Sequence, residues 1–81
     1  MVVSSVKEFG GAIRARRKEL GMTQAALAEL GGFSVSFLSD LENGKQTAEI
    51  GKALFLLNLL GMDLELRVRG AGGMNIRDRQ F

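Results

Sequence analysis

The sequence predicts a small all-α domain followed by one β-strand. Apolar residues recur at intervals of three and four before Gly61, as they do on the buried face of a helix. Hydroxyl side chains and glycines stand where these helices would begin and end. After Gly61 the apolar period changes to two, which is typical of a half-buried strand. With 81 residues, the chain forms one domain or one domain with a tail, and a partner subunit would help to stabilise its small core.

The first helix is predicted to run from Ser5 to Leu20. Ser5 and Glu8 match a capping box, in which the serine caps the helix and the glutamate reaches back. Gly10 and Gly11 lie inside this helix, where each costs about 1 kcal/mol relative to alanine. They indicate either a close helix contact or early fraying. One face of the helix carries Phe9, Ile13, Arg17 and Leu20.

Two short helices joined by a tight turn are predicted between Gly21 and Lys45. Gly21 ends the first helix, Thr23 and Ser34 cap the two that follow, and Gly32 suits a turn that needs a positive φ. The inward positions are Leu27, Ala28, Phe33, Leu38 and Leu41. This spacing predicts a helix-turn-helix, which presents its second helix to the major groove of DNA. An αα-hairpin in an ordinary small helical domain is the alternative.

A further helix is predicted after Thr47, which would cap it. Its predicted core positions are Ile50, Ala53, Leu54, Leu57 and Leu60. Three more apolar residues, Phe55, Leu56 and Leu59, fall outside that stripe. They favour a subunit interface, because one small domain cannot easily bury so much apolar surface. The alternative is a helix buried on most sides within the monomer.

The strand that follows alternates Leu64, Leu66 and Val68 with charged residues. No other segment of the sequence has this period, so we expect the strand to pair with its copy in a second subunit about a two-fold axis. The predicted dimer interface consists of Phe55, Leu59, Leu64, Leu66 and Val68. The predicted organisation is a helix-turn-helix domain over 1–61, a dimerising strand over 62–69 and a flexible tail over 70–81, which is inert or binds a protein.

The formal net charge is only +2, but the basic residues are clustered. The clusters are Arg14, Arg16, Arg17 and Lys18 in the first helix, and Arg67, Arg69, Arg77 and Arg79 near the end. A DNA duplex attracts such clusters because each cation that neutralises a phosphate releases condensed counterions. An ordinary solvated helix face is the alternative.

The composition disfavours an enzyme. The chain has no cysteine and no histidine, so neither the common metal ligands nor the usual general base is present, and we expect no cofactor and no metal. The carboxylates Glu42, Glu49, Asp63 and Glu65 are scattered over separate predicted elements, and no phosphate-binding glycine loop occurs. The first residues lack the pattern of a secretory signal, and the longest apolar run, 53–60, is too short to span a bilayer. We therefore expect a cytoplasmic protein.

The chain resembles the Xre-type helix-turn-helix family over residues 9–60. The matching motifs are Thr23-Gln24, Leu27-Ala28, Gly32, Ser34 and Leu41-Glu42-Asn43-Gly44-Lys45. Residues 51–66 further resemble the end of HipB-type antitoxins, in which a helix is followed by a dimerising strand. The sequence departs from the family pattern at Gly31 and in lacking a basic or amide side chain between Ser34 and Glu42. The resemblance implies a lambda-repressor-like domain of about four to five helices, with a C-terminal strand that pairs across a homodimer.

The resemblance also implies a dimeric transcriptional repressor that binds an operator with two half-sites. For HipB-like relatives it implies an antitoxin that regulates its own operon and neutralises a HipA-like kinase toxin; the alternative is a stand-alone phage-like repressor. The expected base-reading residues are Ser34, Val35, Ser36, Phe37, Ser39 and Asp40. The expected phosphate contacts are Thr23, Gln24, Asn43 and Lys45, and Arg17 with Glu42 matches a structural ion pair of the family. Because no arginine or amide is available for bidentate base contacts, we expect modest discrimination, supplemented by the two half-sites and DNA deformability.

Overall fold

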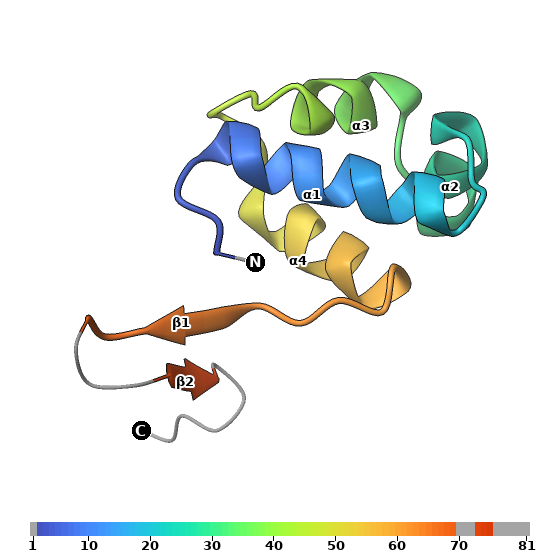
Figure 1. Ribbon diagram of the computed structural model, residues 1–81. Coiled ribbons are helices and arrows are strands. Elements are labelled where there is room, and N and C mark those ends of the chain that lie inside the picture. The colour runs from blue at the N-terminus through green and yellow to red at the C-terminus, as the bar shows by residue number, and fades with distance from the viewer. Residues whose placement is uncertain (1, 70–72, 76–81) are drawn as a thin grey trace.

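Four helices and two short strands make up the described part of the chain. The computed structural model describes residues 2–69 and 73–75. The helices are α1 (Val6–Glu19), α2 (Gln24–Gly31), α3 (Val35–Glu42) and α4 (Ile50–Leu59), and the strands are β1 (Glu65–Arg67) and β2 (Gly73–Asn75). In Figure 1, α3 is seen above α1 and α4 below it, α2 closes one end, and the strands lie beyond α4; α3 and α4 also contact each other through Phe37 and Lys52. The predicted helical fold class is confirmed.

The core lies where the four helices meet. Its buried members are Ile13, Leu27, Ala28, Leu38, Leu41, Ala53, Leu56, Leu57 and Leu60. Burying each leucine or isoleucine contributes about 1.5–3 kcal/mol relative to leaving it exposed. Leu20, predicted to share the buried face of α1, is instead 44% exposed because α1 ends at Glu19 and the chain turns away there.

Hydroxyl side chains cap the first three helices as predicted. The hydroxyl of Ser5 accepts from the Glu8 amide at 3.1 Å, that of Thr23 from Ala26 at 3.0 Å, and that of Ser34 from Phe37 at 3.0 Å. The return contact of the capping box differs from the prediction, because the Glu8 carboxylate accepts from the amide of Ser4 at 2.7 Å and not from that of Ser5. Each cap satisfies an amide that has no partner within its helix.

Gly10 permits a close approach between α1 and α3. A Cβ atom at this position would lie 2.1 Å from the Leu41 carbonyl oxygen and 2.9 Å from that of Glu42. A Cβ at Gly11 would meet nothing within 4 Å. Of the two explanations left open by the sequence, the close helix contact therefore holds for Gly10.

The contacts of α4 correct three predictions. The residue that precedes the helix is Glu49, which makes no side-chain cap, so Thr47 is not the cap. Ile50 is 68% exposed, whereas Leu56 is completely buried with Ala53, Leu57 and Leu60. These four residues form one stripe at intervals of three and four. Since the segment is apolar on nearly all sides, periodicity alone could not choose between this stripe and its neighbours.

The strand β1 has a partner within the chain, which the sequence did not predict. It pairs antiparallel with β2, and Leu66 stands opposite Met74. The residues of β2 lie inside the predicted tail, and the rest of that tail lies outside the described residues. The sequence Gly-Met-Asn has low strand propensity and no alternation, so it gave no signal. A two-stranded sheet still leaves one unpaired edge on β1, so pairing across a dimer stays a prediction.

No helix in the described part of the chain is both long and apolar enough to cross a membrane.

Gly10 and Gly11 provide a matched pair of substitutions. We expect Gly10→Ala to destabilise the domain by about 1–3 kcal/mol, because the added methyl forces α1 away from the backbone of α3. Gly11→Ala serves as the control and should stabilise by about 0.5–1 kcal/mol through helix propensity, since its methyl faces open space. Urea denaturation of both variants measures the difference. Equal effects would contradict the close contact.

Candidate nucleic-acid interface

The outer face of α3 presents small side chains. Val35 is 45% exposed, Ser36 is exposed, and Ser39 and Asp40 are partly exposed, whereas Leu38 and Leu41 point into the core. The hydroxyl of Ser34 already accepts the capping hydrogen bond at the start of the helix. Five of the six predicted base-reading residues thus lie along one side of α3 or at its beginning.

The structure separates Phe37 from the other predicted base-reading residues. Its ring lies 5.2 Å from that of Phe33, centroid to centroid, and Phe33 lies 6.0 Å from Phe55 of α4. The ammonium of Lys52 stands 5.5 Å from the Phe37 centroid, a cation–π contact. Phe37 therefore packs on the α4 side of α3, where its neighbours occupy much of the ring surface.

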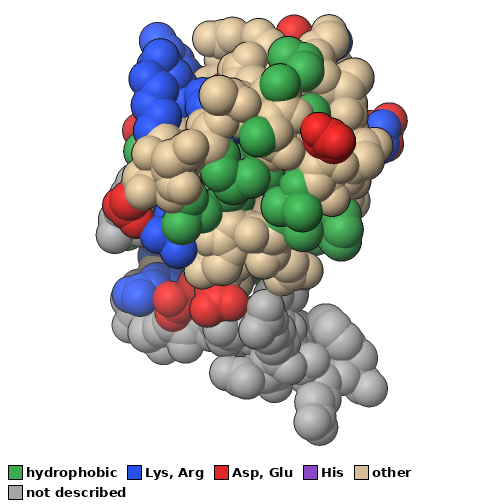
Figure 2. Space-filling model, turned by 90° about the vertical axis from the view of Figure 1, so that its right-hand side faces the viewer, with side chains coloured by type: hydrophobic (Ala, Val, Ile, Leu, Met, Phe, Trp, Pro, Cys, Tyr) green, Lys and Arg blue, Asp and Glu red, His purple; other side chains and the backbone are tan. Residues whose placement is uncertain are grey.

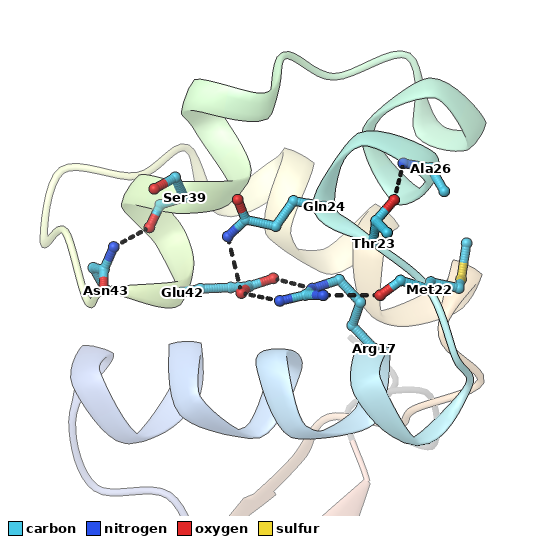
Figure 3. Close-up of polar contacts among 8 residues, drawn as sticks. All are labelled: Arg17, Met22, Thr23, Gln24, Ala26, Ser39, Glu42 and Asn43. Atoms are coloured by element: carbon cyan, nitrogen blue, oxygen red, sulfur yellow. Dashed lines mark hydrogen bonds and ion pairs between the residues drawn. The ribbon is translucent and has the colours of Figure 1, made fainter.

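A buried ion pair connects α1 to the end of α3. The guanidinium of Arg17 donates from Nε to Glu42 Oε2 at 2.8 Å and from Nη2 to Oε1 at 2.9 Å (Figure 3). Arg17 also donates to the Met22 carbonyl at 2.8 Å, and Gln24 donates from Nε2 to Glu42 Oε1 at 3.2 Å. The two charged residues are only 7% and 6% exposed. The sequence-predicted pair is thus brought together, with the start of α2 tied to the same carboxylate.

Burial and hydrogen bonding act in opposite directions on Glu42. Burial alone would raise the pKa of the carboxyl group, but hydrogen bonds from Arg17 and Gln24 outweigh it and hold the pKa below its ordinary value. The hydrogen bond with Glu42 likewise raises the pKa of Arg17. Both groups are consequently charged at neutral pH, and each neutralises the other.

The predicted phosphate contacts stand at the two ends of the α2–α3 motif. Thr23 and Gln24 lie at the start of α2, where the first amides have no helical partner and the helix dipole is positive. Asn43 follows α3, and its Nδ2 donates to the Ser39 carbonyl at 2.9 Å. The ammonium of Lys45 lies 3.4 Å from Asp40 Oδ2, in a pair exposed enough to be readily exchanged for another anion.

The predicted dimer residues divide into two groups. Phe55, Leu66 and Val68 are 49–58% exposed, as an unoccupied interface requires. Leu59 and Leu64 are half-buried and pack against the core of the same chain. The five residues are therefore not equally available to contact a second copy of the chain.

Gly31, which departs from the family pattern, has a packing role of its own. A Cβ there would lie 2.5 Å from the Phe33 ring and 3.0 Å from Leu59 Cδ1. Those two side chains occupy the space in which the family usually places an apolar side chain at this position.

Two further features of the structure were not predicted from the sequence. Arg16 donates from Nε to the Leu60 carbonyl at 2.9 Å and thereby joins α1 to the end of α4. Hydrophobic side chains also gather on the face of the molecule that carries α2 (Figure 2), and Leu30 of α2 is 60% exposed. No group of three acidic, histidine or cysteine side chains in the described residues could hold a metal ion.

Comparison with known proteins identifies the family. A family model described as "Helix-turn-helix" matches residues 13–66. The "Uncharacterized HTH-type transcriptional regulator y4mF" of Sinorhizobium fredii (strain NBRC 101917 / NGR234) is 37% identical over 68 residues, which are 84% of this chain and 90% of the relative. The chain belongs to the Xre-type helix-turn-helix family. The resemblance drawn from residues 9–60 is thus confirmed.

Solved structures place this family member among proteins of HipB-like fold. The structure titled "HipB-O4 20mer complex" superposes with a TM-score of 0.77 at 22% identity, over 85% of this chain and 97% of that one. The structure titled "Structure of HipA-HipB-O2-O3 complex" gives the same TM-score of 0.77, again at 22% identity and over 85% and 97% of the two chains. At these identities the likeness establishes the fold alone.

Removing one partner of the buried pair should unfold much of the domain. We expect Glu42→Ala to cost about 3–5 kcal/mol, because it leaves the buried guanidinium of Arg17 without its counter-charge. Chemical denaturation measures the loss. The matched control is Arg17→Met with Glu42→Leu, which removes both charges and should be much less destabilising. A loss below about 1 kcal/mol in Glu42→Ala would show that the pair is not buried in solution.

Proposed function

We propose that this protein is a sequence-specific transcriptional repressor that binds double-stranded DNA as a homodimer. The observation that carries the proposal is the outer face of α3, which is solvent-accessible and free of large side chains. It is flanked by the positive end of α2 on one side and by the loop of Asn43 and Lys45 on the other. Such a surface lets a helix enter the major groove while groups at the start of α2 and in the loop after α3 contact phosphates.

Base reading is assigned to Ser34, Val35, Ser36, Ser39 and Asp40. Serine hydroxyls can donate or accept, the valine methyls suit a thymine methyl, and the aspartate can accept from a cytosine amino group. The same role for Phe37 has weaker support, because its ring packs against Phe33 and Lys52. None of these side chains makes the strong bidentate contacts of arginine or glutamine, so each base pair is read weakly.

Dimerisation would place two such helices on successive half-sites of an operator. The exposed side chains of Phe55, Leu66 and Val68 and the unpaired edge of β1 support this arrangement. A second copy that pairs at that edge would extend the two-stranded sheet and cover its apolar face. Leu59 and Leu64, which the core already holds in part, would contribute less to the contact.

We further propose that the repressor is an antitoxin that binds a HipA-like kinase toxin encoded beside it and represses their common operon. The HipB-like fold supports this proposal, and one of the similar structures is titled as a complex that contains HipA. A stand-alone phage-like repressor of the same family would need only the DNA and dimer surfaces. The two functions therefore differ in whether the chain has a protein partner of another kind.

The base-reading assignment is tested by Val35→Ala and Ser36→Ala. Both side chains are exposed, so the variants should fold normally and change the ranking of operator variants bearing single base-pair changes. Gel-shift titration against the region upstream of the gene measures that ranking, with a change of about 1–3 kcal/mol at the affected position. Ala25→Ser, an exposed change on α2, is the control. An unchanged ranking in both variants would refute the assignment.

Partner choice is tested by expressing the chain with its neighbouring genes and purifying the complex. We expect a stoichiometric kinase-like protein to co-purify with two copies of this chain, as light scattering and mass spectrometry can show. Recovery of a DNA-binding dimer without a second protein would favour the stand-alone repressor. A monomer that does not bind duplex DNA would contradict both functions.

A further inference from the structure

The structure divides the basic cluster of α1 into cations that hold the fold together and cations without a partner. Arg16 bonds to Glu19 and to the Leu60 carbonyl, and Arg17 bonds to Glu42. The side chains of Lys7, Arg14 and Lys18 make no hydrogen bond or ion pair within the residues that the structure describes, and all three residues are exposed. The second group is therefore available to an external anion.

Lys7 lies directly against the loop that follows α3. Gly44 approaches α1 so closely that a Cβ on it would lie 2.7 Å from the Cα of Lys7 and 3.1 Å from its amide nitrogen. Gly44 also stands between Asn43 and Lys45, which are the proposed phosphate contacts on this side of the motif. The first turn of α1 and the phosphate-contacting loop thus form one continuous surface.

Arg14 extends this surface along α1. It is four residues after Gly10, which touches the Leu41 carbonyl, and three before Arg17, which binds Glu42. Residues at these intervals share one side of a helix, so Arg14 flanks the last turn of α3. The charge of Arg14 also contributes to the lowered pKa of Glu42, in agreement with this position.

We propose that Lys7 and Arg14 contact the phosphate backbone of the bound duplex and continue the line of contacts that Asn43 and Lys45 begin. The inference rests on the DNA-binding function proposed above. Because Arg17 pairs with the buried Glu42, that carboxylate does not oppose a phosphate beside Arg14. Seven residues of helix span about 10 Å, which is the axial rise of about three nucleotides of one strand. The first helix is thereby a DNA-contacting element in addition to a support for α3.

The test compares the salt dependence of binding in Lys7→Gln, Arg14→Gln and the double variant. The slope of log K against log salt should fall by about one unit for each substitution. Between about 50 and 200 mM salt, the double variant should then lose about tenfold less affinity than the wild type. Arg69→Gln is the control: it removes one positive charge two residues after the end of β1, the strand that lies beyond α4 in Figure 1, and should leave the slope unchanged.

Thermal unfolding of each variant checks that the fold is retained, as expected for side chains without partners. A wild-type slope in both single variants, with Lys45→Gln lowering it, would overturn the role of α1 while leaving the DNA-binding function intact. Absence of any salt-dependent binding by the wild type would overturn both. If Arg69→Gln lowers the salt slope as much as Lys7→Gln or Arg14→Gln does, only the net charge of the protein matters, and the proposal is also overturned.

Discussion

The position of α3 depends on one buried carboxylate. Glu42 receives hydrogen bonds from Arg17 of α1 and Gln24 of α2, and Arg17 also holds the carbonyl of Met22. Three helices therefore meet at a single carboxylate, whose negative charge the guanidinium of Arg17 neutralises. A buried pair of this kind adds little net stability compared with apolar side chains. Its paired hydrogen bonds nevertheless form in only one relative orientation of the guanidinium and the carboxylate. The main effect of this pair is therefore to fix the position of α3 relative to α1 and α2.

Glycine makes that geometry reachable. At Gly10 the backbone of α3 occupies the space of a side chain, so the axes of α1 and α3 can approach closely enough for the guanidinium to reach the carboxylate. Gly44 likewise permits a close approach, here between the loop after α3 and Lys7 of α1. Its φ of +83° is also one that a residue without a Cβ adopts readily. Close contact and the ion pair are thus two parts of one arrangement.

The sequence predicted those features that depend on neighbours within a few residues. The hydroxyl caps of α1, α2 and α3 and the glycine that ends α2 are local interactions, so their spacing predicted them, whereas the cap predicted at Thr47 is not formed. On α4, Ala53, Leu57 and Leu60 are buried as predicted, but Ile50 and Leu56 were misassigned, because a helix that is apolar on nearly every side takes its orientation from distant partners. The partner of β1 was missed for a related reason, since Gly73–Asn75 has no strand pattern and pairs only because the chain returns to it.

The candidate site shows the same division between local and distant causes. The family resemblance implied that Arg17 and Glu42 are partners, but the sequence gave no indication that Gln24 donates to the same carboxylate or that Phe37 packs toward α4. Both contacts reduce the number of side chains that α3 and α2 can offer to DNA. What remains on α3 is small, and small side chains read a base pair weakly but permit the helix backbone to approach the groove closely. If α3 reads bases as proposed, selectivity comes from where the helix is held and from how the duplex deforms to meet it, and the junction at Glu42 then contributes to recognition by fixing the position of α3.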